Sequence, residues 1–348
     1  MYKPPFDVNP KIINLISDIS EKIGYVNSLE ITPESVRLRK KNRIKTIHST
    51  LAIENNSLSL EQITALIDGK RVIGSNDEIQ EVKNALEAYD ALLTFNPYSQ
   101  KDLMFAHSLM MHGLVDTCGK YRKDGVGIIN GVNIVHIAPP PERVPTLMKE
   151  LFSWLRLSSL HPLIKSSVFH YEFEFIHPFQ DGNGRMGRLW QTVILKEWKE
   201  VFAYLPVESL IKANQKEYYS VLNRCDSRAD STEFIEFMLT LLLKAIEGII
   251  KDENKSSKDL SKGDLNITQN VTQKVTQNST KRANQKLTQN QEKIIKVIKK
   301  NPYITQSELS EIVGITRKSI ISNMNKLKEA GLIERIGPDK GGYWIIKN

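Results

Sequence analysis

Apolar residues recur at intervals of three and four over much of the first 250 positions, which is the spacing of one face of an α-helix. The clearest early example is the series Ile12, Ile16, Ile19 and Ile23. The pattern predicts several helices over residues 1–120. Ser59 and the glutamine three positions later have capping-box spacing, so a helix begins after Ser59, and Glu54 lies at the C-terminal end of the preceding helix.

The pattern changes at residues 125–136, where apolar and polar positions alternate about Asn130-Gly131, a pair typical of tight hairpin turns. We predict a small β-hairpin there. Helical spacing resumes after a run of three prolines and continues from 144 to about 250, with a loop at 181–184. Residues 168–176 are compatible with either a helix or a strand, because aromatic residues alternate within them.

Hydrophobic content falls in residues 251–290, where Lys, Ser, Asn, Gln and Thr dominate, and this composition predicts a flexible polar linker. Residues 291–348 then read as helices at 291–300, 306–313 and 317–330, with a turn at Gly314 and a wing near the end. We therefore expect three parts: a mainly α domain in residues 1–250, the linker, and a C-terminal module.

This C-terminal module resembles a winged helix-turn-helix, whose third helix enters the major groove of DNA. The side chains that it would offer to DNA are Arg317, Lys318, Ser319, Ser322, Asn323 and Lys326. Residues 251–348 carry 19 Lys and Arg against 10 Asp and Glu, whereas residues 1–250 carry 29 against 30. The basic excess favours DNA as the partner, although such modules also mediate protein contacts or dimerise.

Several classes of protein are disfavoured by the composition. The most apolar segment, 234–250, is interrupted by three charged residues, so we expect no membrane span. The N-terminus lacks the pattern of a secretory signal. Two cysteines without CxxC spacing predict neither a disulfide framework nor a thiolate metal site, and we expect a cytoplasmic protein.

The segment 177–188, His-Pro-Phe-Gln-Asp-Gly-Asn-Gly-Arg-Met-Gly-Arg, contains the main candidate chemistry. Pro178 disfavours helical geometry at the residue before it, so His177 ends a helix. A glycine-rich turn that opens the next helix exposes N–H groups to an anion, and Arg185 and Arg188 lie three residues apart in its first turn. Asp181 offers an oxygen to Mg²⁺. This combination favours phosphoryl or nucleotidyl transfer.

The same segment matches the pattern HPFx[D/E]GNGRxxR and therefore resembles the signature loop of the Fic family. Weaker similarities at 119–128 (GKYRKDGVGI) and 234–239 (FIEFML) extend the resemblance over roughly the first 250 residues. The resemblance implies a mostly helical Fic domain with a β-hairpin flap, and a helix at 168–176. It also implies a protein adenylyltransferase, which moves AMP from ATP, with Mg²⁺, to a Ser, Thr or Tyr hydroxyl of a protein.

Carried over position by position, the resemblance makes His177 the general base and Asp181 the Mg²⁺ ligand. Arg188 would hold the γ-phosphate, and Arg185 would contact phosphates or ribose. The full nucleotide-binding set that it implies is Phe179, Gly182, Asn183, Gly184, Arg185, Gly187 and Arg188. Phe179 is expected to pack the loop into the core, while Gly182, Asn183 and Gly184 line an anion hole.

Three alternatives remain open at the level of sequence. The phosphotransferase branch of the family has Lys where this chain has Gly182, which favours AMP transfer over phosphate transfer, but a toxin-like or phosphotransfer enzyme remains an alternative. A transcription regulator whose Fic-like domain only senses nucleotide is a further possibility. His170, Glu174 and His177 also have the i, i+4, i+7 spacing of zinc ligands on one helix face.

The resemblance also suggests regulation and partners. Thr50, Glu54 and Asn55 match the inhibitory motif [S/T]xxxE[G/N], in which Glu54 would pair bidentately with Arg188 in place of the γ-phosphate. The hairpin would hold a target segment as an added strand, although an ordinary surface hairpin fits as well. Thr268, Thr272 and Thr276 of the linker are candidate targets in cis, because they are tethered near the site, and self-association into a homodimer is compatible with the family.

Overall fold

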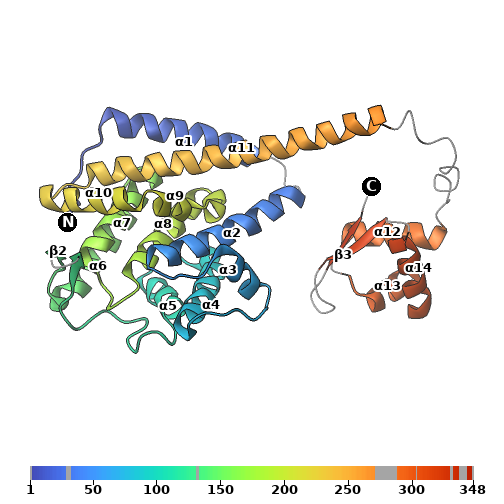
Figure 1. The fold of residues 1–348 in the computed structure, drawn as a ribbon, viewed down its shortest axis with the longest axis horizontal. Helices are drawn as coiled ribbons and strands as arrows, with labels where there is room; N and C mark the ends of the chain where they lie inside the picture. Colours follow the sequence, from blue (N-terminus) through green and yellow to red (C-terminus); the bar gives the residue numbers. More distant parts are fainter. Residues whose placement is uncertain are drawn as a thin grey trace. The chain divides into compact units, whose positions relative to one another are not determined.

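The structure is a computed structural model that describes residues 2–28, 33–130, 133–270, 288–302, 304–329, 332–336 and 343–346 (Figure 1). The chain divides into two compact units, Met1–Lys262 and Gly263–Asn348. The division falls inside the segment 251–290 that the sequence predicts to be a linker. Each unit is described by itself.

The described part of the first unit consists mainly of helices. They are α1 (Pro10–Ser28), α2 (Pro33–Ile53), α3 (Leu60–Ile67), α4 (Asn76–Asp90), α5 (Gln100–Met110), α6 (Val144–Leu157), α7 (Pro162–Ile176), α8 (Asn183–Trp198), α9 (Val207–Ala213), α10 (Gln215–Arg228) and α11 (Thr232–Asn270), whose last residues continue past the boundary at Lys262. Short 3-10 turns occupy Leu92–Thr94, Pro141–Arg143 and Glu200–Tyr204. Ser59 and Gln62 form the predicted capping box at the start of α3, and α2 ends at Ile53, directly before Glu54.

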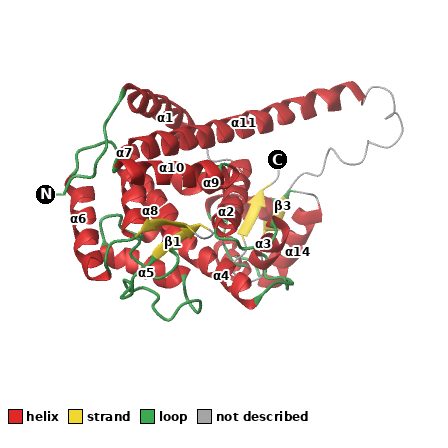
Figure 2. Cartoon of the chain, turned by 60° about the vertical axis from the view of Figure 1, so that its left-hand side comes forward, coloured by secondary structure: helices red, strands yellow, loops and turns green. Residues whose placement is uncertain are grey.

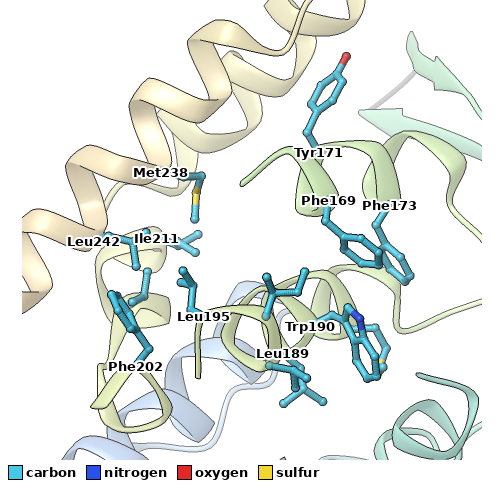
Figure 3. Packing of buried hydrophobic residues seen from close by; sticks show 14 of the residues in the cluster. Phe169, Tyr171, Phe173, Leu189, Trp190, Leu195, Phe202, Ile211, Met238 and Leu242 are labelled. Atoms are coloured by element: carbon cyan, nitrogen blue, oxygen red, sulfur yellow. The ribbon is translucent and has the colours of Figure 1, made fainter. Parts of the chain in front are cut away.

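Helices α7 and α8 pack against each other, and most of their residues are buried (Figure 3). Phe169 and Phe173 lie one turn apart on α7 with their rings stacked, and Figure 3 places them near Trp190 of α8, while Tyr171 points the other way. This helical arrangement resolves the ambiguity of residues 168–176, as the family resemblance implies. The alternation of aromatic residues reflects burial on several sides rather than a strand.

Helix α11 is longer than the sequence predicts, because it continues to Asn270 instead of ending near Ile250. Its first half is anchored by buried residues such as Phe234 and Ile246. Helix nucleation is the costly step, and the buried first half has already supplied it. Each further residue that joins the helix then gains one backbone hydrogen bond, so polar residues can extend it. Residues 271–287 of the predicted linker lie outside the described residues. Among the described helices, none combines the length and the apolarity needed to cross a membrane.

The predicted hairpin is present as β1 (Gly127–Asn130) and β2 (Asn133–Ile137), an antiparallel pair drawn in yellow in Figure 2. The register pairs Gly127 with Ile137 and Asn130 with Asn133, with an irregularity between Ile128 and Ile129. The turn residues 131–132 lie outside the described residues. β2 runs close to α10, which places the hairpin beside the helices that follow the signature loop.

The second unit has the order of a winged helix-turn-helix: α12 (Gln289–Lys300), α13 (Gln306–Val313), α14 (Arg317–Glu329), β3 (Ile333–Ile336) and β4 (Tyr343–Ile346). The two strands pair antiparallel, and buried residues including Ile298, Leu309, Ile320 and Trp344 form a separate core. Gly314 ends α13 with a φ of 74°, so the turn lies where the sequence predicts it. The wing tip, 337–342, lies outside the described residues.

Candidate active site

The segment 177–188 forms the loop between α7 and α8 and the start of α8. His177 ends α7 in a left-handed conformation with a φ of 49°, directly before Pro178. Gly182 has a φ of 82° and precedes the first residue of α8. A Cβ atom at Gly182 would lie 2.6 Å from Met111 Sδ, so both the backbone and the available space require glycine. The two left-handed residues place the imidazole at one end of the loop and the N-terminus of α8 at the other.

Asn183 and Phe179 hold the loop together from inside. The Asn183 side chain accepts the N–H of Phe179 at 2.9 Å and donates to the carbonyl of the same residue at 2.8 Å. Both residues are buried. The sequence predicts Asn183 as part of an anion hole. Because its side chain is used within the loop, any contribution to anion binding would come from its backbone N–H.

His107 of α5 lies directly against this loop, although its sequence context indicates only a locally hydrogen-bonded histidine. Its ring stacks on Phe179 with centroids 3.7 Å apart. Nδ1 accepts the N–H of Gly119 at 2.8 Å, so Nε2 carries the proton and donates to the Asp181 carbonyl at 3.0 Å. Burial lowers the pKa of His107 to about 4, which keeps the ring neutral and this hydrogen-bond pattern intact.

Asp181 is the one acidic residue of the segment 177–188, and 60% of its side chain is exposed. Its Oδ2 lies 3.4 Å from Arg185 Nη2, and the buried Arg185 guanidinium also contacts Glu81 Oε1 of α4 at 3.0 Å. Glu81 Oε2 in turn accepts a hydrogen bond from Asn56 at 2.8 Å. Arg185 is therefore directed toward α4 and orients Asp181, while Arg188, three residues later, contacts α2.

Arg188 and Glu54 form an ion pair, with Arg188 Nη2 2.7 Å from Glu54 Oε1. The other contacts of this guanidinium go to Thr50, from Nε to Oγ1 at 3.0 Å and from Nη2 to the carbonyl at 3.1 Å. The pair thus has one short contact where the sequence predicts a bidentate one. Burial is the largest influence and lowers the pKa of Arg188, but the charge and hydrogen bond of Glu54, together with Tyr218 and Glu174, raise that pKa above its ordinary value.

The Glu54 carboxylate also lies against the start of α8. A Cβ atom added at Gly184 would be 2.4 Å from Glu54 Oε1, so the absence of a side chain there makes room for this oxygen. An anion at a helix N-terminus is stabilised by the unpaired N–H groups and the helix dipole. The Glu54 carboxylate is therefore an anion placed between Arg188 and the first turn of α8.

The end of α2 that carries Glu54 is fastened to α9 and α10. Lys212 donates a hydrogen bond to the carbonyl of Ala52, and Gln215 donates to the carbonyl of Ile53 at 3.0 Å. Asn55 then has a φ of 71°, which turns the chain away from the helix. The three residues of the predicted inhibitory motif are thus all at this turn or in the last turn of α2.

His170 and Glu174 lie on α7 where it packs against Gly187 of α8, and they do not form the alternative zinc site. His170 Nδ1 is 2.8 Å from Gln191 Oε1 and Nε2 is 3.1 Å from the Tyr218 hydroxyl, so both ring nitrogens have partners. His177 is outside the helix in its left-handed position, and this breaks the shared helix face. Across the described ranges, no three His, Cys, Asp or Glu side chains are grouped closely enough to hold a metal ion.

Arg122 is a second residue that sequence reasoning missed. Its guanidinium is buried and donates to four backbone carbonyls, from Nε to His177 at 2.7 Å and from Nη1 to Asp124 at 2.9 Å, and from Nη2 to Pro139 and Ile176. Its own N–H donates to the Pro178 carbonyl at 2.9 Å. The available signal was its place in the segment GKYRKDGVGI, which resembles the family without indicating a role.

In the second unit, exposed residues recur at intervals of three and four along α14 and form one mainly polar face of this helix. Arg317, Lys318, Ser322 and Lys326 of the predicted DNA-contacting set are exposed on this face. Three exposed residues that were not predicted, Ile321, Asn325 and Lys328, share it. The remaining predicted residues, Ser319 and Asn323, are only half-buried and bond within the segment: Asn323 donates to the Ser319 carbonyl, and the Ser319 hydroxyl contacts Thr316.

Comparison with known proteins agrees with both parts of this description. The model of the Fic/DOC family matches residues 97–195, and that of a winged helix-turn-helix DNA-binding family matches residues 287–334. The protein adenylyltransferase Fic of Drosophila mojavensis is 28% identical over 245 residues, which cover 67% of this chain and 46% of that protein. The chain thus spans about half the length of the curated relatives that it matches.

Solved structures extend the similarity. Fic-1 of C. elegans is 23% identical with a TM-score of 0.61, over 70% of this chain and 73% of that one, which shows a shared fold. A Fic family protein from Desulfovibrio desulfuricans G20 is 42% identical with a TM-score of 0.70, and the match covers 99% of this chain and 98% of that one. Because this similarity includes the signature loop as well as the C-terminal unit, the chain belongs to the Fic family and carries a winged helix-turn-helix domain.

Proposed function

We propose that this protein transfers AMP from ATP to a hydroxyl group of a protein side chain. The observation that carries the proposal is the place of the Glu54 carboxylate, an anion held by Arg188 against the N-terminus of α8, one loop away from His177. A triphosphate offers the same negative charge to the same groups. The adenylyltransferase relatives support this choice of reaction.

Gly182 supports AMP transfer over phosphate transfer. The phosphotransferase branch of the family has lysine at this position. Here the φ of 82° and the contact distance of 2.6 Å from a Cβ atom to Met111 Sδ leave no room for a side chain without rearrangement of the loop. The loop geometry of this chain therefore favours the branch with glycine.

In this proposal, Arg188 and the N–H groups at the start of α8 bind the phosphates, with Gly184 giving them close access and Gly187 packing α8 against α7. Arg185 keeps Asp181 oriented. The exposed Asp181 carboxylate fits Mg²⁺, which proteins commonly hold through one or two carboxylates together with phosphate oxygens. The ion, when bound, would neutralise phosphate charge.

His177 acts as the general base of the transfer. The hydroxyl oxygen of the target attacks the α-phosphorus of ATP, and its proton passes to the imidazole of His177. The new oxygen–phosphorus bond forms as the bond to the β-phosphate oxygen breaks, and pyrophosphate leaves with that electron pair. The left-handed backbone at His177 and the carbonyl contact with Arg122 keep the imidazole at the end of α7 during this step.

Glu54 acts as a brake on this reaction, because its carboxylate takes the place proposed for a phosphate. ATP would then bind poorly or in an unproductive pose. Glu54→Gly is expected to raise automodification with labelled ATP, whereas the exposed Glu87→Ala variant serves as a matched control and keeps the parent's rate. An unchanged rate in Glu54→Gly would refute the brake.

Incubation with ATP labelled at either the α- or the γ-phosphate tests the reaction itself. Label from the α-position alone supports AMP transfer, and label from the γ-position alone supports a phosphotransferase. No incorporation from either, in Glu54→Gly, favours the rival function, a nucleotide-sensing regulator. His177→Ala should abolish incorporation in every case.

The partners that we propose follow from the hairpin and the C-terminal domain. The β1–β2 hairpin holds a segment of the target protein as an added strand, and the linker threonines are candidate targets in cis, of which Thr272 and Thr276 lie outside the described residues. The exposed face of α14, which includes Arg317, Lys318, Ser322 and Lys326, binds DNA.

A further inference from the structure

Arg122 lies at the meeting point of three segments that the proposed reaction needs in one arrangement. The end of α7 contributes the carbonyls of Ile176, His177 and Pro178. The segment that leads into β1 contributes the Asp124 carbonyl, and the segment that leaves β2 contributes that of Pro139. These last two residues stand just outside the two strands, so they are the roots of the hairpin.

We propose that Arg122 is a positioning residue that fixes the hairpin at a set distance from His177, so that a target strand docked on the hairpin presents its hydroxyl to the imidazole. The inference rests on the AMP transfer proposed above. In this scheme Arg122 contacts neither the nucleotide-binding residues nor the target. It acts through the backbone of His177 and of the two hairpin roots, Asp124 and Pro139.

The geometry of the side chain explains why an arginine is needed. A guanidinium is a rigid planar fork with five N–H donors, and Arg122 uses donors on all three of its nitrogens to reach both hairpin roots and the end of α7 together. A lysine ammonium at the end of a flexible stem has three donors around one atom, so it cannot span the same carbonyls. The Ala138 N–H, which donates to the Val126 carbonyl at 3.3 Å, joins the two roots but does not reach α7.

Arg122 affects the reaction rate by placing the hairpin relative to His177. Without the Arg122 guanidinium, the carbonyls of Asp124, Pro139 and His177 lose their common hydrogen-bond donor. The hairpin can then shift relative to the His177 imidazole. A misplacement of about 1 Å between a base and its substrate costs about 100-fold in rate. Nucleotide affinity should be preserved, because the contacts of Arg188 and Gly184 involve α2 and α8 rather than Arg122.

The test compares Arg122→Lys and Arg122→Ala in a Glu54→Gly background, where AMP transfer is measurable. At saturating ATP, we expect the transfer rate of Arg122→Lys to fall about 100-fold while its Kd for ATP stays at the parent's value. Hydrogen exchange should quicken in peptides covering 122–139 and 173–180 and stay unchanged elsewhere. Added methylguanidinium should restore part of the activity to Arg122→Ala and none to His177→Ala.

Arg156→Lys is the matched control, because this exposed arginine also donates to a carbonyl, that of Tyr98 at 3.0 Å, away from the loop. Transfer at the parent's rate by Arg122→Lys, with unchanged exchange at the hairpin, would overturn the inference. Loss of ATP binding together with faster exchange throughout the domain would also overturn it, since the role would then be general folding. If the Glu54→Gly parent transfers no AMP, the proposed function fails, and the exchange data still decide whether Arg122 fixes the hairpin to α7.

Discussion

Replacement of Glu54 by alanine probes the energetic balance around Arg188. The Arg188 side chain is 1% exposed and that of Glu54 is 31% exposed. Removal of one partner from a fully buried ion pair costs about 3–5 kcal/mol. The cost here is smaller, because Glu54 is partly hydrated and Arg188 keeps its hydrogen bonds to Thr50. We expect Glu54→Ala to lower the free energy of unfolding of the nucleotide-free protein by about 2 kcal/mol.

The same change should strengthen ATP binding, because the carboxylate no longer competes for Arg188. A difference of about 2 kcal/mol corresponds to a Kd that is about 30-fold lower. In calorimetric melts of the full chain, the transition of the first unit should shift down by about 4–8 °C without nucleotide. Saturating ATP should then raise the Tm of Glu54→Ala more than that of the parent. Glu54→Gln keeps an acceptor for Arg188 and should fall between the two.

Opposite signs for the two effects are the distinctive part of this prediction. A carboxylate with a merely structural role would lower the Tm when removed and leave the ATP affinity unchanged. A Glu54→Ala protein that melts at the parent's temperature and binds ATP with the parent's Kd would refute the view that Glu54 and a phosphate compete for Arg188. Titration calorimetry on the parent, Glu54→Ala and Glu87→Ala gives the affinities directly.

Three further predictions follow from other parts of the chain. Lys212→Ala removes a hydrogen bond worth about 1 kcal/mol from the last turn of α2, so AMP transfer should rise about fivefold in the parent but not in a Glu54→Gly background, as measured by label incorporation. Burial raises the pKa of Glu172 from 4.5 to about 7, so the folded protein holds this proton more tightly than the unfolded chain does. The free energy of unfolding therefore falls as the pH rises from 4.5 to about 7. Glu172→Gln removes this loss, and its unfolding free energy in denaturant titrations should exceed the parent's by about 3 kcal/mol near pH 8 and converge with it near pH 4. If the second unit binds DNA, Lys318→Ala should reduce the salt slope of binding by about one, whereas Asn323→Ala should leave the slope unchanged in anisotropy titrations.

The signature loop is predictable from sequence because its constraints act between neighbouring residues. Pro178 restricts the residue before it, and the structure accordingly places His177 at the end of α7. Ser59 and Gln62 act three positions apart and form the expected capping box. The hairpin is likewise encoded in alternation about a single turn. In each case the residues that make the contact are close together in the sequence, so a local sequence pattern is enough to predict it.

The residues that sequence reasoning missed act over long separations. Arg122 contacts a carbonyl 55 positions away, His107 one 74 positions away, and Glu81 an arginine 104 positions away. Each of them taken alone is compatible with a surface charge or a locally bonded histidine. The direction of Arg185 and Arg188 is a related case. Their spacing predicts a shared face of α8, but the acids that they contact belong to α4 and to the turn after α2, whose positions depend on the tertiary fold.

The contacts of the turn 54–57 have a consequence for how the proposed brake is released. Asn56 in this turn bonds to Glu81, and the other oxygen of Glu81 holds Arg185, which orients Asp181. A movement that withdraws Glu54 far enough to free Arg188 also pulls on Asn56, and therefore disturbs the carboxylate proposed for Mg²⁺. Small displacement of the Glu54 side chain, with the turn left in place, avoids this conflict. If Glu54 is a brake as proposed, we therefore expect its release by rotation of the side chain rather than by removal of α2, with nucleotide driving that rotation by competing for Arg188.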